Sequence, residues 1–323
     1  MAKQAAKPAA ALADNSRARK AAASRARTAA AYVTPALIGI LLINIFPILY
    51  TVYISLTNRN GPTRFAEGTY RVTGFDNYTR LLRQSDFYIV FGKTILYAVI
   101  CVFFFFVVGL TFAIILSNPL IKGKAVWRTL MILPWAVPAW ITALIWKFLF
   151  HGQYGPINQI LRTVGISGPD WLSHGTTAFI AVTIFNIWLS YPFFMLVLMG
   201  GLAAIPTDIY EAAEIDGAGW WRQLFTITLP LLRPVAIPAI ILSLITTFKI
   251  LDPIWLMTKG GPVTRVGQPG ATELLLPWAY NQGFQGGQRF GLIGAFSIIV
   301  FIMLVCMTLI YSRVTNATKG IYE

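Results

Sequence analysis

Six stretches of this chain are apolar over a length that can cross a lipid bilayer, and no other feature of the sequence restricts the fold as much. A membrane-spanning helix needs about 20 mostly apolar residues. Strands of a membrane barrel would instead alternate between apolar and polar residues, whereas residues 99–110 are almost uniformly apolar. With 56% hydrophobic and 12% charged residues, the chain is also too apolar for a soluble domain of 323 residues. We therefore predict an all-α membrane protein with six transmembrane helices, near Tyr32–Leu56, Gly92–Leu116, Leu130–Phe150, Thr177–Ala203, Val235–Met257 and Phe290–Tyr311.

The distribution of Lys and Arg predicts the orientation of these helices, because short cytoplasmic loops hold an excess of basic residues. Fourteen of the 26 Lys and Arg residues fall on one side: in the N-terminal tail, after the second run, after the fourth run and in the C-terminal tail. Eleven fall on the other side, and Lys249 lies within a run. This bias places both termini in the cytoplasm.

The chain is predicted to be one membrane domain between two tails. Residues 1–30, rich in Ala, Arg and Lys, have too little apolar surface to form a core and are expected to be a disordered basic cytoplasmic tail. Residues 31–313 form the six-helix domain, and residues 314–323 form a cytoplasmic C-terminal tail. The net charge of +14 does not indicate a nucleic-acid partner, since the basic residues are spread over loops on both sides of the membrane.

A polar segment between the fourth and fifth runs, residues 206–234, has the signals of a compact folded element. Asp208 and the glutamate three residues later are spaced as in a capping box at the start of a short helix. Gly217 can end that helix, since glycine readily adopts a left-handed conformation. A second short helix is expected over residues 220–228 and should stop against Pro230, because proline disrupts a helix interior. We call this predicted pair of short helices the elbow.

The elbow carries a spaced set of residues: Glu211, Ala212, Ala213, Asp216, Gly217, Ile227, Leu229 and Pro230. This set resembles the EAA motif of ABC importer permeases, which is a highly specific signature. In that family the segment is a cytoplasmic coupling helix that fits a cleft on an ATPase subunit. Closure of the ATPase dimer is thereby passed to the transmembrane helices. The resemblance implies the same coupling role for these residues here.

An alternative is that the elbow merely lies on the lipid headgroups. An interfacial helix is normally rich in Lys and Arg on its polar face. The elbow has the opposite charge there, with Asp208, Glu211, Glu214 and Asp216. The acidic face therefore favours a protein partner.

Further segments, residues 122–126, Leu133-Pro134, residues 186–192 and Gly260-Gly261-Pro262, are similar to the maltose and maltodextrin permeases of the MalF type. The resemblance implies the type I ABC importer architecture and a permease subunit, in the cell membrane, that moves maltose, maltodextrin or a related oligosaccharide. It implies as partners a second, MalG-like permease, two ATPase subunits and an extracytoplasmic sugar-binding protein. ATP and Mg²⁺ would be used by the ATPase subunits. This chain is not expected to bind a cofactor or to be an enzyme.

The sequence departs from the best-known form of that family in its first outer loop. This loop, Thr57–Phe91, is short. A large folded insertion outside the membrane is therefore not expected, and the resemblance implies a compact six-helix version.

Polar residues within the apolar runs indicate where a substrate could pass, because such residues are costly in lipid and normally face a bundle interior or an aqueous cavity. They include Asn44, Asn186, Lys249 and Asp252. The family resemblance implies that sugar contacts Ser190, Phe193, Ser243, Thr246, Thr247 and Ile250.

Aromatic residues near this path raise two alternatives that the sequence leaves open. Sugars bind flat apolar faces as well as hydroxyl partners. Trp188, Tyr191, Phe193 and Trp255 could supply such faces, or could equally face lipid or pack within the bundle.

Two further pairs suggest local distortions or contacts. Pro134 and Pro138 remove backbone hydrogen bonds four residues apart, which predicts a kink in the third span. Lys249 and Asp252 have the spacing of neighbours on one helical face, which suggests an ion pair or part of a gate.

No catalytic or metal-binding constellation stands out in the sequence. The tripeptide Gly92-Lys93-Thr94 lacks the preceding glycine of a phosphate-binding loop. Importers of another sugar or of a sugar-phosphate, a secondary transporter, and a structural or signalling subunit remain as alternatives. A secondary transporter should show inverted repeats and membrane-embedded charges.

Overall fold

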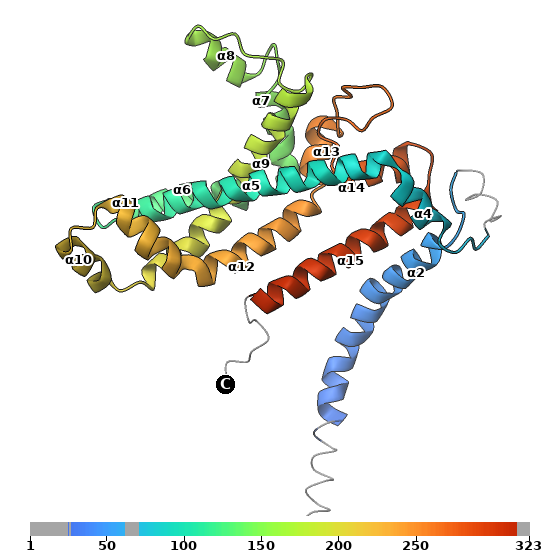
Figure 1. Ribbon diagram of the computed structural model, residues 1–323, viewed down its shortest axis with the longest axis horizontal. Coiled ribbons are helices and arrows are strands. Elements are labelled where there is room, and N and C mark those ends of the chain that lie inside the picture. The colour runs from blue at the N-terminus through green and yellow to red at the C-terminus, as the bar shows by residue number, and fades with distance from the viewer. Residues whose placement is uncertain (1–24, 26, 62–70, 315–323) are drawn as a thin grey trace, which may run out of the picture.

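The computed structural model describes residue 25, residues 27–61 and residues 71–314, and this part of the chain is almost entirely helical. Its only recorded β pairing is an isolated antiparallel bridge between Thr57 and Val72. The helices form an elongated bundle (Figure 1). Two short elements, α10 (Thr207–Ile215) and α11 (Trp220–Gln223), lie at one end, which we call the elbow end. The opposite end carries α4 (Asp76–Arg83) and α14 (Leu275–Tyr280).

The remaining described elements include the helices of the apolar runs and shorter helices between them. They are η1 (Leu41–Ile45), α2 (Phe46–Ser55), α5 (Ser85–Ser117), α6 (Lys124–Ala136), α7 (Ala139–Leu149), α8 (Pro156–Thr163), α9 (Gly175–Ala203), η2 (Leu224–Thr228), α12 (Leu229–Phe248), α13 (Asp252–Thr258), η3 (Asn281–Gln285) and α15 (Phe290–Val314).

Five of the six predicted spans contain a helix long and apolar enough to cross a membrane, within the residues that the structure describes. These helices are Arg27–Ser55, Ser85–Ser117, Gly175–Ala203, Trp220–Phe248 and Phe290–Arg313. The first of them begins within the range expected for the N-terminal tail. Most of both predicted tails lies outside the described residues.

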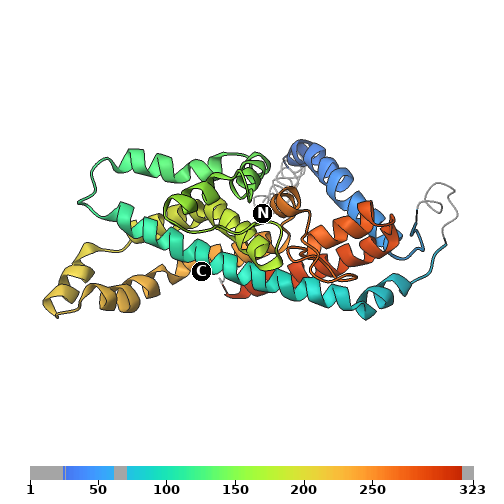
Figure 2. The ribbon, with the colours of Figure 1, turned by 90° about the horizontal axis from the view of Figure 1, so that it is seen from above.

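The third predicted span is broken rather than merely kinked. Helices α6 and α7 meet at an angle of 93°. Pro134 lies inside α6, and Pro138 precedes the first residue of α7. Because Pro138 lacks a backbone N–H and disfavours helical geometry in the residue before it, Val137 adopts an extended conformation and the helix ends there. The predicted distortion is thus confirmed, and it turns α7 and α8 away from the bundle (Figures 1 and 2).

The fifth predicted span ends earlier than expected. Helix α12 stops at Phe248, and the chain turns through Lys249–Leu251 before α13 begins at Asp252. Lys249 and Asp252 therefore do not share a helical face, and the predicted pairing on one helix is wrong. The physical reason is tertiary, since α13 packs against α7 instead of continuing α12.

The centre of the bundle is the contact between α5 and α9, which is the most extensive between any two elements. Phe194 of α9 packs against Phe105 and Phe106 of α5, with ring centroids 6.3 and 6.2 Å apart. Gly109 allows this approach. A Cβ atom added there would lie 2.5 Å from the Cβ of Phe194 and 2.9 Å from the backbone nitrogen of Met195.

A buried amide holds the first span at the end opposite the elbow. The Asn77 side-chain nitrogen donates to the carbonyl oxygens of Ser55 and Thr57, at 2.8 and 2.7 Å. Ser55 is the last residue of α2, where backbone acceptors lack intrahelical partners, and Thr57 follows two residues later. The same amide accepts a hydrogen bond from Asn60, whose side-chain oxygen accepts one from the backbone of Leu292. The network joins α2, α4 and α15.

The packing of α5 on α9 generates a prediction with an internal control. Gly109→Val should lower stability by about 1–3 kcal/mol, because the added atoms overpack a close helix contact. Gly92→Val, on the same helix, should have a much smaller effect, since nothing lies within 4 Å of a Cβ at that position. Thermal unfolding of the purified protein in detergent measures both. Equal losses for the two variants would show that the α5–α9 contact does not depend on Gly109.

Candidate functional site

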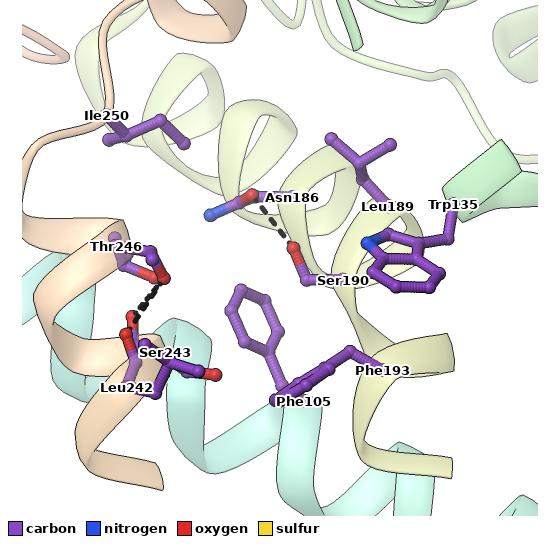
Figure 3. Close-up of a pocket in the computed structure, with 11 residues that line it drawn as sticks. Phe105, Trp135, Asn186, Leu189, Ser190, Phe193, Leu242, Ser243, Thr246 and Ile250 are labelled. Atoms are coloured by element: carbon purple, nitrogen blue, oxygen red, sulfur yellow. Dashed lines mark hydrogen bonds between the residues drawn. The ribbon is translucent and has the colours of Figure 1, made fainter. Parts of the chain in front are cut away.

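A cavity of about 390 Å³ opens between α5, α6, α9 and α12. It lies near the middle of the bundle, beside the break between α6 and α7. All six residues predicted for the substrate path line it: Ser190, Phe193, Ser243, Thr246, Thr247 and Ile250. Phe105, Trp135, Asn186, Leu189 and Leu242 complete the lining (Figure 3).

Ile250 reaches the cavity although it lies outside α12. Because the helix ends at Phe248, Ile250 lies two residues beyond it in a non-helical turn. Its side chain projects over the same space as Thr246 and Asn186 (Figure 3).

The hydroxyl groups on α12 differ in whether they form hydrogen bonds within the protein. The Thr246 hydroxyl donates to the carbonyl oxygens of Leu242 and Ser243, at 3.1 and 3.0 Å. The hydroxyls of Ser243 and Thr247 make no hydrogen bond within the part of the chain that the structure describes. Two hydroxyl groups on this wall are therefore available to a ligand.

On the facing helix, Asn186 presents a buried amide with unused capacity. Its side-chain oxygen accepts a long hydrogen bond from the Ser190 hydroxyl, at 3.4 Å. Its side-chain nitrogen is buried and has no hydrogen-bond partner among the described residues. An unpaired buried donor costs about 1–3 kcal/mol.

The apolar part of the wall comes from residues that sequence reasoning mostly missed. Phe105 was not predicted at all, and Trp135 was missed because only the break after α6 leaves it beside Phe193, with ring centroids 6.4 Å apart. In the sequence, the feature that could have pointed to Trp135 was its position as an aromatic residue next to Pro134.

Three of the four aromatic residues suggested for sugar contact are absent from the cavity lining. Trp188 packs against Trp146 at 5.3 Å, and Trp255 packs against Tyr280 at 4.6 Å. The Tyr191 hydroxyl donates to the carbonyl oxygen of Met131 at 3.0 Å. The packing alternative is therefore correct for these three.

Two other polar residues also lie elsewhere. Asn44 is on the exposed surface of the first span, within the π turn η1. Lys249 is exposed at the end of α12. Neither contributes to the cavity.

The elbow forms a second candidate site, and its first helix is α10. None of the side chains of α10 is buried. The helix begins after Pro206, and no side chain caps it, so the predicted capping box is wrong. Asp208 lies within the first turn instead, where a carboxylate interacts favourably with the helix dipole.

The end of α10 follows the prediction for Gly217. Its φ of +75° is left-handed, its N–H donates to the carbonyl of Glu214, and the next N–H, of Ala218, donates to the carbonyl of Ala213. This hydrogen-bond pattern is a Schellman motif, which satisfies carbonyls at the helix end.

The second half of the elbow differs from the prediction. The helix that starts at Trp220 does not stop at Pro230 but runs continuously to Phe248. The reason is η2, a π-helical turn in which the Leu229 N–H donates to the carbonyl of Leu224, five residues earlier. This wider turn relieves the clash and missing hydrogen bond that proline imposes on an α-helix.

Side-chain hydrogen bonds join the two arms of the elbow, and one of them links α10 to η2. The hydroxyl groups of Tyr210 on α10 and Thr228 on η2 are 3.0 Å apart. The motif residues differ in exposure. Glu211, Ala212, Asp216 and Gly217 are exposed, whereas Ala213, Ile227, Leu229 and Pro230 are partly buried. The elbow thus offers an exposed helix supported from behind.

A single helix connects the elbow to the cavity. Residues 220–248 run from the second arm of the elbow to the wall that carries Ser243, Thr246 and Thr247. At 1.5 Å per residue, Thr228 and Ser243 are about 22 Å apart along the axis. The elbow and the cavity wall thus belong to the same helix.

Comparison with known proteins identifies relatives over most of the chain. The family described as "Binding-protein-dependent transport system inner membrane component" matches residues 106–319. A trehalose/maltose transport system permease protein MalF of Thermococcus litoralis is 36% identical over 282 residues, covering 87% of this chain and 91% of the relative. The maltose/maltodextrin transport system permease protein MalF of Escherichia coli K12 is 38% identical over 265 residues, or 79% of this chain. This alignment spans only 51% of that longer relative.

Among solved structures, a bacterial alginate ABC transporter chain has a similar fold. Its TM-score is 0.73 at 21% identity, covering 90% of this chain and 96% of that one. That structure was solved in complex with an alginate pentasaccharide-bound periplasmic protein.

Proposed function

The chain belongs to the family of binding-protein-dependent transport system inner membrane components, and we propose on this premise that it is the permease subunit of an ABC importer for maltose, trehalose or a short maltodextrin. The relatives named above support the class of substrate, and the cavity supports the position of the substrate-binding site. The substrate path runs through the cavity formed by α5, α6, α9 and α12.

The chemistry of the cavity supports a neutral sugar. Its volume of about 390 Å³ falls in the range of small-molecule sites, roughly 300–1,000 Å³. Free hydroxyls on α12 lie in a cavity that also has aromatic rings in its wall, which matches the polar edges and flat apolar faces of a sugar. None of the lining residues carries a charge. A sugar-phosphate would be expected to need a cationic partner.

Coupling to ATP hydrolysis is proposed to pass through the elbow. Helix α10 is exposed, ends in a rigid Schellman motif and is bonded through Tyr210 to the helix that lines the cavity. An ATPase subunit bound to α10 would therefore act on the substrate path through a continuous helix. The assembly would contain two ATPase subunits, a second, MalG-like permease and an extracytoplasmic sugar-binding protein.

A secondary transporter is the main alternative from another class. It would need membrane-embedded charges for ion coupling. The two candidates, Lys249 and Asp252, lie at and beyond the end of α12 and do not line the cavity. Their positions favour the ATP-driven importer.

The hydroxyls of α12 provide the experiment that tests the substrate path. In cells expressing the complete importer, Thr247→Val should lower uptake of labelled maltose or trehalose about tenfold, since one hydrogen bond to a buried group contributes about 1 kcal/mol or somewhat more. Thr183→Val is the matched control, because Thr183 lies on α9 outside the cavity lining and its hydroxyl donates to the carbonyl oxygen of Phe179. It should transport at close to the wild-type rate. Equal behaviour of the two variants would show that sugar does not bond to this wall.

The turn of the elbow allows a separate test of coupling. Gly217→Val should strain the left-handed turn by ~1–2 kcal/mol and reduce both uptake and substrate-stimulated ATP hydrolysis. Gly219→Val adds the same side chain two residues later, where φ is −66° and nothing lies within 4 Å of a Cβ. Hydrogen exchange at residues 213–218 should rise only in the first variant. Full coupling in Gly217→Val despite faster exchange would contradict the proposed role of the elbow.

A further inference from the structure

The second arm of the elbow exposes a group of aromatic side chains. Trp221 and Phe225 are 67% and 61% exposed, and their rings stack with centroids 6.2 Å apart. Trp220 is 53% exposed and meets Trp221 edge-on at 4.4 Å. We call these three residues the aromatic cluster. So much exposed aromatic surface on one helical turn indicates a partner that covers it.

The length of the helix leaves room for the aromatic cluster outside the hydrocarbon core of the membrane. Residues 220–248 form one helix of 29 residues, which is about 44 Å long at 1.5 Å per residue. The hydrocarbon core is only about 30 Å thick. The excess of about 14 Å corresponds to about nine residues, which is the length of the arm 220–228 at the elbow end.

The arm has the composition of a membrane interface. Trp is enriched at the level of the lipid headgroups, where its apolar ring and its N–H are both accommodated. Arg222 is exposed between Trp221 and Phe225, and no acidic residue occurs in residues 220–234. Helix α6 repeats the pattern in its first turns, where Trp127 is 49% exposed and Arg128 follows it.

The other arm of the elbow has the opposite character. Asp208, Glu211, Glu214 and Asp216 are all exposed, and residues 206–219 contain no Lys or Arg. Carboxylates find no favourable partner among lipid phosphates, whereas Arg222 does. The reversal of charge occurs at the turn around Gly217.

We propose that the elbow is divided between two partners: the aromatic cluster and Arg222 are seated in the phospholipid headgroup layer, while α10 is held off the bilayer. Phospholipid phosphates receive Arg222, and the rings of Trp221 and Phe225 lie among the headgroups and the first methylene groups. Binding in the headgroup layer fixes the height of the elbow relative to the membrane. A push on α10 is then transmitted along residues 220–248 instead of tilting the whole elbow into water.

Depth measurement with nitroxide labels tests this division directly. Phe225→Cys and Ile215→Cys place one label on each arm, and Ile215 is 87% exposed on α10. The background variant Cys306→Ala removes the exposed native cysteine, and buried Cys101 is retained. The assembled importer is placed in phospholipid nanodiscs, with and without its ATPase subunits. Collision with oxygen, which concentrates in lipid, is compared with collision with a water-soluble nickel chelate.

The label at residue 225 should collide mainly with oxygen, whether or not ATPase subunits are present. The label at residue 215 should collide mainly with the nickel chelate and become protected when ATPase subunits are added. Nickel accessibility at residue 225 that is lost on adding ATPase subunits would overturn the proposal, because the aromatic cluster would then be a protein-docking face. Trp221→Cys repeats the measurement if Phe225→Cys does not assemble.

Discussion

The structure depends on the need to satisfy backbone hydrogen bonds inside a bilayer. Because lipid offers no partners, each spanning segment must be helical unless its ends face protein or a cavity. Both interruptions obey this rule, since α6 ends at Ala136, next to the lining residue Trp135, and α12 ends at Phe248, two residues before the lining residue Ile250. The cavity therefore lies where two helices stop.

One helix carries both functional regions of the chain. It begins in the elbow, passes through the π turn η2 and reaches the cavity wall at Ser243 and Thr247. The π turn matters because it lets the helix include Pro230 without a break. A break at that point would have separated the elbow from the cavity. The hydrogen bond between Tyr210 and Thr228 adds α10 to the same unit.

Sequence reasoning succeeded where the determining interactions are local. The left-handed conformation of Gly217 follows from the chemistry of glycine and from the polar residues around the turn. The disruption at Pro138 follows from a missing N–H. It failed at Asp208, where the helix starts at Thr207 after Pro206 and no side chain caps it, and at Pro230, where the neighbouring turn widened. In both cases the rule for a single residue type was overridden by the residues next to it in the sequence.

The sequence by itself determined that the chain is an α-helical membrane protein, where its apolar runs lie and, through family resemblance, which six residues share the cavity. Only the tertiary structure decided that α12 ends at Phe248, that Trp135 and Phe105 complete the cavity, and that the buried side-chain nitrogen of Asn186 has no partner among the described residues. The physical reason is that an apolar run shows that a segment is removed from water but does not show the path that the segment follows. A straight helix and a broken one bury similar residues, and the choice depends on contacts such as α13 on α7 between segments distant in sequence.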